Sequence, residues 1–452
     1  MKQGCLLSPV LFNIFVNCIV NDLKQINCGV PVLDTKVDLL MYADDIVLFA
    51  ENENSLQKML DCVTTWTEKW RISLNESKTQ VVHFRTKSRE KTKVQFKCCN
   101  SDIDTVEGYK YLGIWFDEFL DFHVSTSNLA ASASRALGLV ISKAKALGGM
   151  NFNTFTKLYD SFVSPILDYG SGVWGVNEFS SINAVFYRAC RFFLGVGKYA
   201  PNDAMLGDVG WDPPFVRQMQ SVARLWSRLS KLDDNRYPKK VFLWSQHLAN
   251  NGIKNWYYKV KNICSKLKCE LVLNLADQIC TRSLVNHVKD GAKLFVENRW
   301  KEAIFNDRRK NQNARNKLRT YRTFKNTYGT AQYVNTCMKK CNRRALALFR
   351  SGCAPIAIET GRYNNTPVDN RVCSMCDMNC VEDEFHCFMI CVIYNDFRSK
   401  LFDCMSEFDP SFNDLTSVDK FNVLMSDGNH CYRVAKFANQ ILSLRQSIMY
   451  NT

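Results

Sequence analysis

The chain has 452 residues, of which 46% are hydrophobic and 12% aromatic, so it is long enough for several domains and too apolar to be disordered throughout. It has 59 Lys and Arg against 44 Asp and Glu, a net charge of +15. This excess predicts a polyanionic partner, nucleic acid or an acidic membrane surface. The apolar run over 5–20 is interrupted by Pro9, Asn13 and Asn17, which argues against a signal peptide and a membrane span. We therefore expect an intracellular protein with reduced cysteines.

Hydrophobic spacing predicts the elements in chain order. Apolar pairs at helical spacing from Leu6 to Ile26 predict a buried helix with Pro9 in its first turn. Apolar runs at 37–41 and 46–50 flank the segment Tyr42-Ala43-Asp44-Asp45 and predict a β-hairpin. Further expected elements are a helix at 55–70 capped by Asn54 or Ser55, strands at 80–84 and 109–116, helices at 130–147 and 155–167, and mostly helices from there to the end.

The acidic turn of that hairpin is the first candidate site. Asp44 and Asp45 are adjacent carboxylates between apolar strands, so we expect two like charges in a partly desolvated place. Mg²⁺ would neutralise them, because it binds carboxylates together with substrate phosphates. Two such ions about 4 Å apart stabilise the attacking and leaving oxygens of a phosphoryl transfer. The alternative is a turn that uses aspartate only for its backbone hydrogen bonds.

Four short motifs in sequence order resemble those of reverse transcriptases, in the style of non-LTR (LINE-type) retrotransposons. They are Gln3-Gly4 with Ser8-Pro9-Val10-Leu11-Phe12-Asn13, the Tyr42-Ala43-Asp44-Asp45 segment, Leu74-Asn75-Glu76-Ser77-Lys78-Thr79, and Tyr111-Leu112-Gly113. Segments near Tyr321 and Ile358 also resemble the C-terminal region of those polyproteins. One departure is Arg71, which stands where the family usually has glycine.

The resemblance implies RNA-directed DNA polymerase activity in target-primed reverse transcription, with an RNA template, a DNA primer or target and deoxynucleotides as partners, and no membrane. Asp44 would hold Mg²⁺, Asp45 would be a weaker or indirect ligand, and Lys78 would neutralise or protonate the departing pyrophosphate. The residues expected to contact template, primer or nucleotide are Gln3, Gly4, Ser8, Pro9, Tyr42, Asn75, Tyr111 and Gly113. The resemblance further implies a nuclear and cytoplasmic location.

In this family, a third metal-binding aspartate and the fingers subdomain precede the Gln-Gly motif, and an endonuclease precedes the polymerase. Because Gln3 follows Met1 and Lys2, we expect half a palm with an exposed sheet edge and no activity in the chain alone. A catalytically inactive nucleic-acid-binding remnant is therefore the alternative. The expected fold is α+β: a partial palm at 1–120, a helical thumb at 121–215, a basic helical connector at 216–350 and a C-terminal Cys/His region at 351–452.

A second candidate site lies in the C-terminal part, where ten of the 20 cysteines follow residue 336. The spacing Cys373-x2-Cys376-x9-His386-x4-Cys391 offers three thiolates and an imidazole, a set that satisfies tetrahedral Zn²⁺ and predicts a structural site. Cys380 and Cys387 compete for the last two positions, and a group of buried free cysteines is the alternative.

A third candidate is a basic stretch, because residues 301–350 contain 14 Lys or Arg and two acids, a net of +12. Cations that neutralise phosphates alternate there with aromatic side chains that could stack on bases. The residues expected to bind nucleic acid are Arg308, Arg309, Lys310, Arg315, Lys317, Arg319, Tyr321, Arg322 and Lys325. The alternative is a solvated helix face whose aromatics pack in the core.

Overall fold

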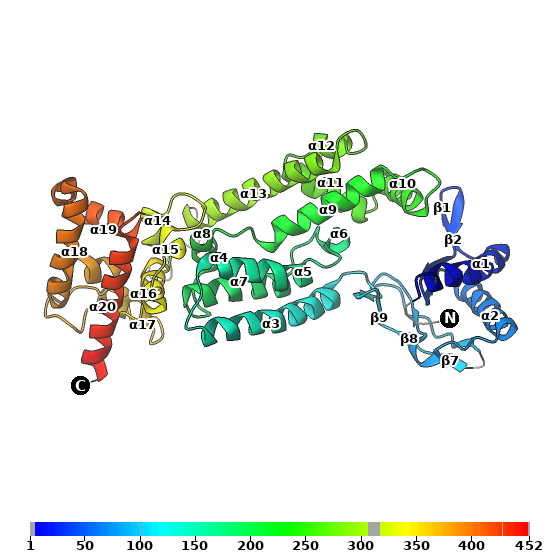
Figure 1. Cartoon of the computed structure of the whole chain (residues 1–452), viewed down its shortest axis with the longest axis horizontal. Coiled ribbons are helices and arrows are strands. Elements are labelled where there is room, and N and C mark those ends of the chain that lie inside the picture. The colour runs from blue at the N-terminus through cyan, green and yellow to red at the C-terminus, as the bar shows by residue number, and fades with distance from the viewer. Residues whose placement is uncertain (1–4, 100, 306–316, 427, 451–452) are drawn as a thin grey trace.

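The computed structural model describes residues 5–99, 101–305, 317–426 and 428–450, which form a mixed α/β structure with a predominance of helix. Figure 1 shows an elongated molecule with the mixed N-terminal part at one end, long helices in the middle and the C-terminal helices at the other end. Gln3 and Gly4 lie outside the described residues, as do Arg308, Arg309, Lys310 and Arg315. No helix within the described ranges combines the length and the apolar character needed to span a membrane.

The N-terminal part has a small core between two helices and a β-hairpin. Its elements are α1 (Ser8–Ile26), β1 (Val30–Val32), β2 (Thr35–Val37), β3 (Leu39–Tyr42), β4 (Asp45–Leu48), α2 (Glu53–Trp70), a 3-10 turn (Glu76–Lys78), β5 (Val81–Val82), β6 (Phe96–Cys98), β7 (Ser101–Ile103), β8 (Thr105–Val106), β9 (Gly108–Tyr111) and β10 (Ile114–Asp117). Ile19, Leu23, Met59 and Phe96 are fully or almost fully buried there. Among the described residues, the strands pair only two by two: β1–β2, β3–β4, β5–β8, β6–β7 and β9–β10. The β3–β4 hairpin therefore has no described partner strand at either edge, as the sequence predicts.

Helix α1 is less buried than its apolar pattern predicts. Val16, Ile19 and Leu23 are buried, but Val10 and Ile14 are more than half exposed, because α2 covers the first half of the helix only on the side of Phe15. The prediction of a buried helix is therefore correct only for its second half. The predicted cap of α2 is also wrong: Asn52, rather than Asn54 or Ser55, accepts the bond from the Ser55 amide at 2.9 Å.

The C-terminal end of α2 shows why glycine would be expected at position 71, where this chain has arginine. Arg71 has φ +55°, its amide donates to the Glu68 carbonyl, and the Ile72 amide donates to the Thr67 carbonyl. These two bonds define a Schellman C-cap, in which the left-handed residue is usually glycine because a Cβ is strained there. The position usually occupied by glycine in the family is thus occupied by an exposed arginine in a left-handed conformation.

We expect Arg71→Gly to stabilise the N-terminal part by about 1 kcal/mol, because relief of the left-handed strain exceeds the added freedom of the unfolded chain. Hydrogen exchange of the α2 amides should slow about fivefold if they exchange through unfolding of this part. Arg71→Ala removes the same charge but retains the Cβ, so it should leave the exchange rates nearly unchanged. Equal effects of the two variants would contradict this explanation.

The rest of the described chain is helical. Its helices are α3 (His123–Ala146), α4 (Phe152–Phe162), α5 (Ser164–Leu167), α6 (Ser171–Trp174), α7 (Ser180–Leu194), α8 (Asn202–Val209), α9 (Pro214–Ser230), α10 (Tyr237–Asn250), α11 (Trp256–Lys266), α12 (Glu270–Asn274), α13 (Thr281–Phe305), α14 (Tyr321–Phe324), α15 (Gln332–Asn335), α16 (Lys340–Arg350), α17 (Ala357–Thr360), α18 (Asn395–Phe408), α19 (Ser417–Met425) and α20 (Cys431–Tyr450). The helix predicted at 155–167 is divided, because Pro165 cannot continue the hydrogen bonding of α4.

One continuous hydrophobic core runs through these helices, separate from the core of α1 and α2. The partly buried Trp211 packs against this core, and its ring stacks on Phe155 at 5.9 Å and on Tyr159 at 4.7 Å between ring centroids. The proposed divisions at 215 and 350 do not separate different cores. The divisions proposed at 120, 215 and 350 stay predictions.

Candidate functional site

The acidic hairpin has the predicted form. Strand β3 pairs antiparallel with β4, Tyr42 lies opposite Asp45, and Ala43 and Asp44 form a two-residue loop. Ala43 has φ +53°, as tight hairpin loops require at their first position. Leu39 is buried against the α1–α2 core, which fixes the hairpin to the N-terminal part. This geometry places Asp44 in the loop at the tip of the hairpin and Asp45 directly beside it, at the start of β4.

The prediction that these carboxylates are partly desolvated is wrong. Tyr42, Ala43, Asp44 and Asp45 are all exposed. No described Lys or Arg forms a salt bridge with either aspartate. The tip therefore offers carboxylate oxygens to solvent, and the donor set fits Mg²⁺, which keeps several waters and is completed by substrate phosphates.

A second hairpin lies close to the first. Strands β9 and β10 pair around Leu112 and Gly113, whose φ values of +46° and +86° match a type I′ loop. Burial, followed by the charge of Asp45, raises the pKa of Tyr111. The Tyr111 hydroxyl thus lies in the field of the acidic tip, so the fold brings together two motifs that are more than 60 residues apart in the sequence.

The second hairpin is anchored to the helical part by a residue without any sequence signature. The Tyr169 hydroxyl donates to the Leu112 carbonyl at 2.7 Å. A Cβ at position 113 would lie 3.0 Å from the Tyr169 ring, so Gly113 allows this close approach in addition to its positive φ. No sequence motif contains Tyr169, and only the folded chain shows its role.

The remaining polymerase motifs lie on the surface. Asn75 precedes the 3-10 turn and its carbonyl accepts the Lys78 amide at 3.0 Å. The Lys78 side chain is exposed, and no described contact joins it to Asp44 or Asp45. Ser8 and Pro9 begin α1, where proline suits the first helical turn. The placement of these side chains around a nucleotide stays a prediction.

The cysteine cluster is assembled as the spacing predicts. The Sγ atoms of Cys373, Cys376 and Cys391 and a ring nitrogen of His386 all lie within 4.8 Å of one another. The Cys376 Sγ is 3.6 Å from the His386 Nε2. Burial raises the pKa of Cys373 to about 12, so a strong cation is needed to hold its sulfur as a thiolate. Three sulfurs and one imidazole at these separations fit tetrahedral Zn²⁺.

Backbone geometry fixes the four side chains. An antiparallel bridge between Val372 and Val381 forms the first turn, and within it the Met375 amide donates to the Cys373 sulfur at 3.4 Å. His386 begins a π-helical turn, His386–Ile390, and the Cys391 amide donates to the His386 carbonyl. The competing ligands Cys380 and Cys387 are not members of the cluster, which leaves the predicted set of four.

The basic stretch differs from the prediction. Tyr321 is completely buried and its hydroxyl donates to Asp208 Oδ1 at 3.0 Å, so the interpretation of Tyr321 as a base-stacking residue is wrong. Lys325 is also buried, and its ammonium donates to the Gly329 carbonyl at 3.0 Å. Arg319 donates two bonds to Glu384, at 2.6 and 2.7 Å.

Among the residues predicted to bind nucleic acid, the two other described cations also have partners within the protein. Lys317 forms an ion pair with Glu359. The Arg322 Nε donates to the Leu318 carbonyl at 3.2 Å. Lys317 and Arg319 thereby link distant segments of the chain through Glu359 and Glu384, whereas the bond of Arg322 is local.

Comparison with known proteins agrees with the motifs. Residues 1–116 match the family model "Reverse transcriptase (RNA-dependent DNA polymerase)". The chain is 26% identical over 254 residues to the RNA-directed DNA polymerase from mobile element jockey, and 23% identical over 262 residues to the probable RNA-directed DNA polymerase from transposon X-element, both of Drosophila melanogaster. Each alignment covers 53% of this chain, but only 26% and 27% of the relatives.

A third relative is the Pol polyprotein of the type-2 retrotransposable element R2DM of Drosophila melanogaster, which is 32% identical over 123 residues, 26% of this chain and 12% of that protein. The chain thus spans about a quarter, or less, of the length of these relatives. The matches and the order of the motifs agree: the chain is similar to the reverse transcriptases of non-LTR retrotransposons, and residues 1–116 match the reverse transcriptase family model.

Proposed function

We propose that the chain is part of an RNA-directed DNA polymerase that transfers nucleotides at the acidic hairpin during target-primed reverse transcription. The observation that carries this proposal is the exposed pair Asp44 and Asp45 at a hairpin tip, with Tyr111 in the field of Asp45. When bound, Mg²⁺ supplies charge neutralisation at the transferred phosphate. Asp44 would hold it, and Asp45 would be the weaker ligand.

The other motif residues would position the reactants. Lys78 is exposed, and no described acidic side chain forms a salt bridge with it, so its ammonium could neutralise the departing pyrophosphate. The turn at Leu112 and Gly113, held by Tyr169, would orient the primer strand so that its 3′-hydroxyl faces the nucleotide's α-phosphorus. The RNA template, the DNA primer or target, and deoxynucleotides are the partners of this reaction.

A nucleic-acid-binding protein without polymerase activity is the second candidate. The β3–β4 ladder favours it for the 452-residue chain on its own, because no further described strand pairs with either edge. Such an open ladder holds its carboxylates less rigidly than a complete sheet does, and positioning is a large part of phosphoryl-transfer catalysis.

Primer extension separates the two candidates. The assay uses an RNA template, a DNA primer and Mg²⁺, with this chain preceded by the corresponding palm segment of a relative. We expect extension, and we expect Asp44→Ala to reduce it more than about 100-fold, because loss of even a ligand's supporting partner costs about 10- to 100-fold. The matched control is Asp102→Ala, an exposed acid on β7. Absence of extension in the completed palm would favour the second candidate.

We also propose that Cys373, Cys376, His386 and Cys391 hold a structural Zn²⁺. The supporting observations are the distances among the four ligand atoms and the exclusion of Cys380 and Cys387 from the cluster. All four positions of a tetrahedral ion would be filled by protein, so the site has no coordination position for a reacting water. Its role would be to fold this segment.

A further inference from the structure

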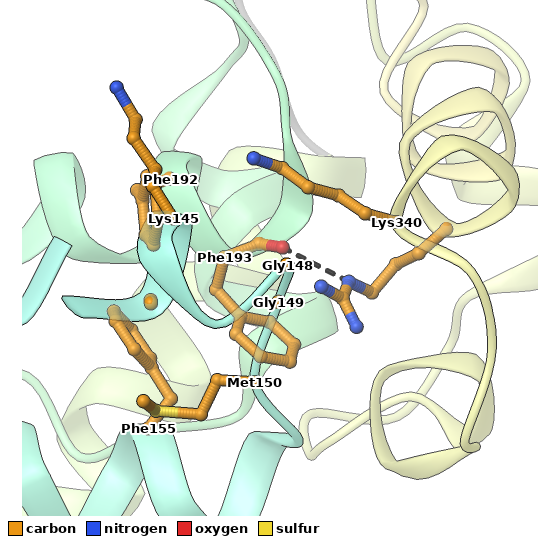
Figure 2. Close-up of a pocket in the computed structure, with 10 residues that line it drawn as sticks. Lys145, Gly148, Gly149, Met150, Phe155, Phe192, Phe193 and Lys340 are labelled. Atoms are coloured by element: carbon orange, nitrogen blue, oxygen red, sulfur yellow. Dashed lines mark hydrogen bonds between the residues drawn. The ribbon is translucent and has the colours of Figure 1, made fainter. Parts of the chain in front are cut away.

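A small cavity lies where the turn after α3 meets α7 and α16. Its volume is about 140 Å³, and it is lined by Ala144, Lys145, Gly148, Gly149, Met150, Phe155, Phe192, Phe193, Lys340 and Arg343. Figure 2 shows the apolar side chains of Met150, Phe155 and Phe193 together, with the Lys340 side chain extending from α16 toward the side of Phe192. The Lys340 ammonium lies 5.1 Å from the centroid of the Phe192 ring. We call this cavity the α3–α16 pocket.

The residues that line the α3–α16 pocket include cations and no acid. The three segments that build it, residues 123–159, 179–202 and 328–358, contain no Asp or Glu at all. Their exposed cations are Arg135, Lys143, Lys145, Lys157, Arg188, Lys198, Lys339, Lys340 and Arg344. A merely solvated surface normally mixes both signs. The local charge therefore favours an anionic ligand.

A buried cation in the pocket wall supports the same conclusion independently. Arg343 is only 6% exposed, and its guanidinium carbon lies 4.0 Å from the centroid of the Phe193 ring. Its Nε donates to the Phe193 carbonyl at 3.0 Å, but no described carboxylate pairs with it. A buried guanidinium without a counter-charge is costly, and burial accordingly lowers the pKa of Arg343. An anion at the pocket mouth would supply the missing charge.

The volume and the lining side chains of the pocket restrict the class of ligand further. A volume of about 140 Å³ is well below the roughly 300–1,000 Å³ of sites that enclose a whole small molecule, so one planar ring fits better than a complete cofactor. Phe192 is half-buried and offers a ring beside the cations. Aromatic rings that stack with bases, next to cations that contact phosphates, are the usual means of binding single strands without sequence preference.

We propose that the α3–α16 pocket binds an unpaired nucleotide of a nucleic-acid strand. The base enters against Phe192, and the adjacent phosphate contacts Lys145, Lys340 and Arg343. The inference rests on the proposal that this chain handles nucleic acid, but it does not depend on chemistry at Asp44 or Asp45. The pocket would distinguish a duplex with an unpaired end from a fully paired one.

The test measures the affinity of the 452-residue chain for a DNA duplex with a short overhang that carries 2-aminopurine, for the same duplex with an abasic overhang, and for a blunt duplex. Phe192→Leu preserves side-chain bulk and removes the ring. We expect it to weaken binding of the overhang duplex roughly tenfold and to abolish the fluorescence quenching of 2-aminopurine. Its affinity for the abasic and blunt duplexes should equal that of the parent chain.

Lys340→Gln tests the contribution of the positive charge. This change should weaken binding, and the slope of log affinity against log salt concentration should fall by the amount that corresponds to about one phosphate contact. Lys266→Gln is the matched control, because Lys266 is an exposed cation on α11, away from the pocket (Figure 1). Thermal unfolding of each variant verifies that the fold is intact.

Three results would overturn the inference. The first is a Phe192→Leu variant that unfolds normally and still prefers the base-containing overhang to the abasic one. The second is loss of that preference only when Arg308, Arg309 and Lys310 are all changed to Gln, which would move the contact to those residues. The third is a parent chain that binds none of the duplexes, which would overturn the nucleic-acid proposal itself.

Discussion

A chain in which Cys373 is replaced by serine is expected to lose its zinc almost completely. The parent chain should contain one Zn²⁺, because four ligand atoms within 4.8 Å of one another form a closed tetrahedral set. Structural zinc contributes about 10–16 kcal/mol of apparent binding free energy in small domains, and this energy is coupled to folding. The segment from Ala357 to Tyr394 should therefore lose its protection against hydrogen exchange. Elemental analysis of the reduced protein gives the metal content directly.

The chain offers matched controls for this experiment. Cys404→Ser changes a half-buried cysteine of α18 that is not a member of the cluster, and it should leave one zinc bound. Cys380→Ser should do the same, since Cys380 lies in the first turn without contributing a ligand. Full zinc content in His386→Ala would contradict the ligand set, and absence of zinc in the parent chain would contradict the site.

The second large effect is expected at a buried ion pair that joins distant parts of the helical core. Asp208 of α8 and Arg350 of α16 are each 1% exposed. Arg350 donates from Nε to Asp208 Oδ2 at 3.0 Å and from a terminal nitrogen to Oδ1 at 2.8 Å. The hydroxyls of Tyr321 and Tyr333 donate to the same carboxylate at 3.0 and 2.7 Å. Four donors from α14, α15 and α16 thus meet on one acid.

Asp208→Asn should destabilise the helical part by about 3–5 kcal/mol, because it leaves the Arg350 charge buried without a counter-ion. This corresponds to a fall of roughly 10 °C in the unfolding midpoint of a unit of this size. The double variant Asp208→Asn, Arg350→Met removes both charges and should recover much of that loss. A single variant that unfolds at the parent temperature would show that the pair contributes little.

A fall in pH should destabilise the helical part through the same Asp208–Arg350 ion pair. Burial alone would raise the pKa of Asp208, but the Arg350 charge and its hydrogen bonds, with Lys325 and Tyr333, outweigh burial and lower it. A lowered folded-state pKa gives stability that is fully present above the unfolded value of about 3.9. This stability disappears as the pH falls through the folded-state pKa. Below about pH 4, the parent chain should therefore lose stability more steeply than the double variant, as measured by thermal unfolding at each pH.

The sequence by itself determined the two local sites. The acidic hairpin could be predicted because apolar residues on both sides of a short polar turn specify strand, turn and register within about ten residues. The four members of the Cys/His cluster could be predicted because Cys-x2-Cys and His-x4-Cys spacing is typical of two turns that each present two metal-binding side chains. Both predictions depend on neighbours in the chain, and the fold had only to bring two short segments together.

The tertiary structure alone decided which charged and aromatic side chains are buried. The 301–350 stretch has a net charge of +12, yet the described members Tyr321, Lys325 and Arg350 lie in the core. Their burial depends on Asp208, which is 142 residues from Arg350, and no local pattern reveals that pairing. The exposure of Asp44 likewise depends on whether another strand covers its hairpin. Since the cost of burying a charge is decided by the partner that neutralises it, a run of cations in the sequence does not specify a binding surface.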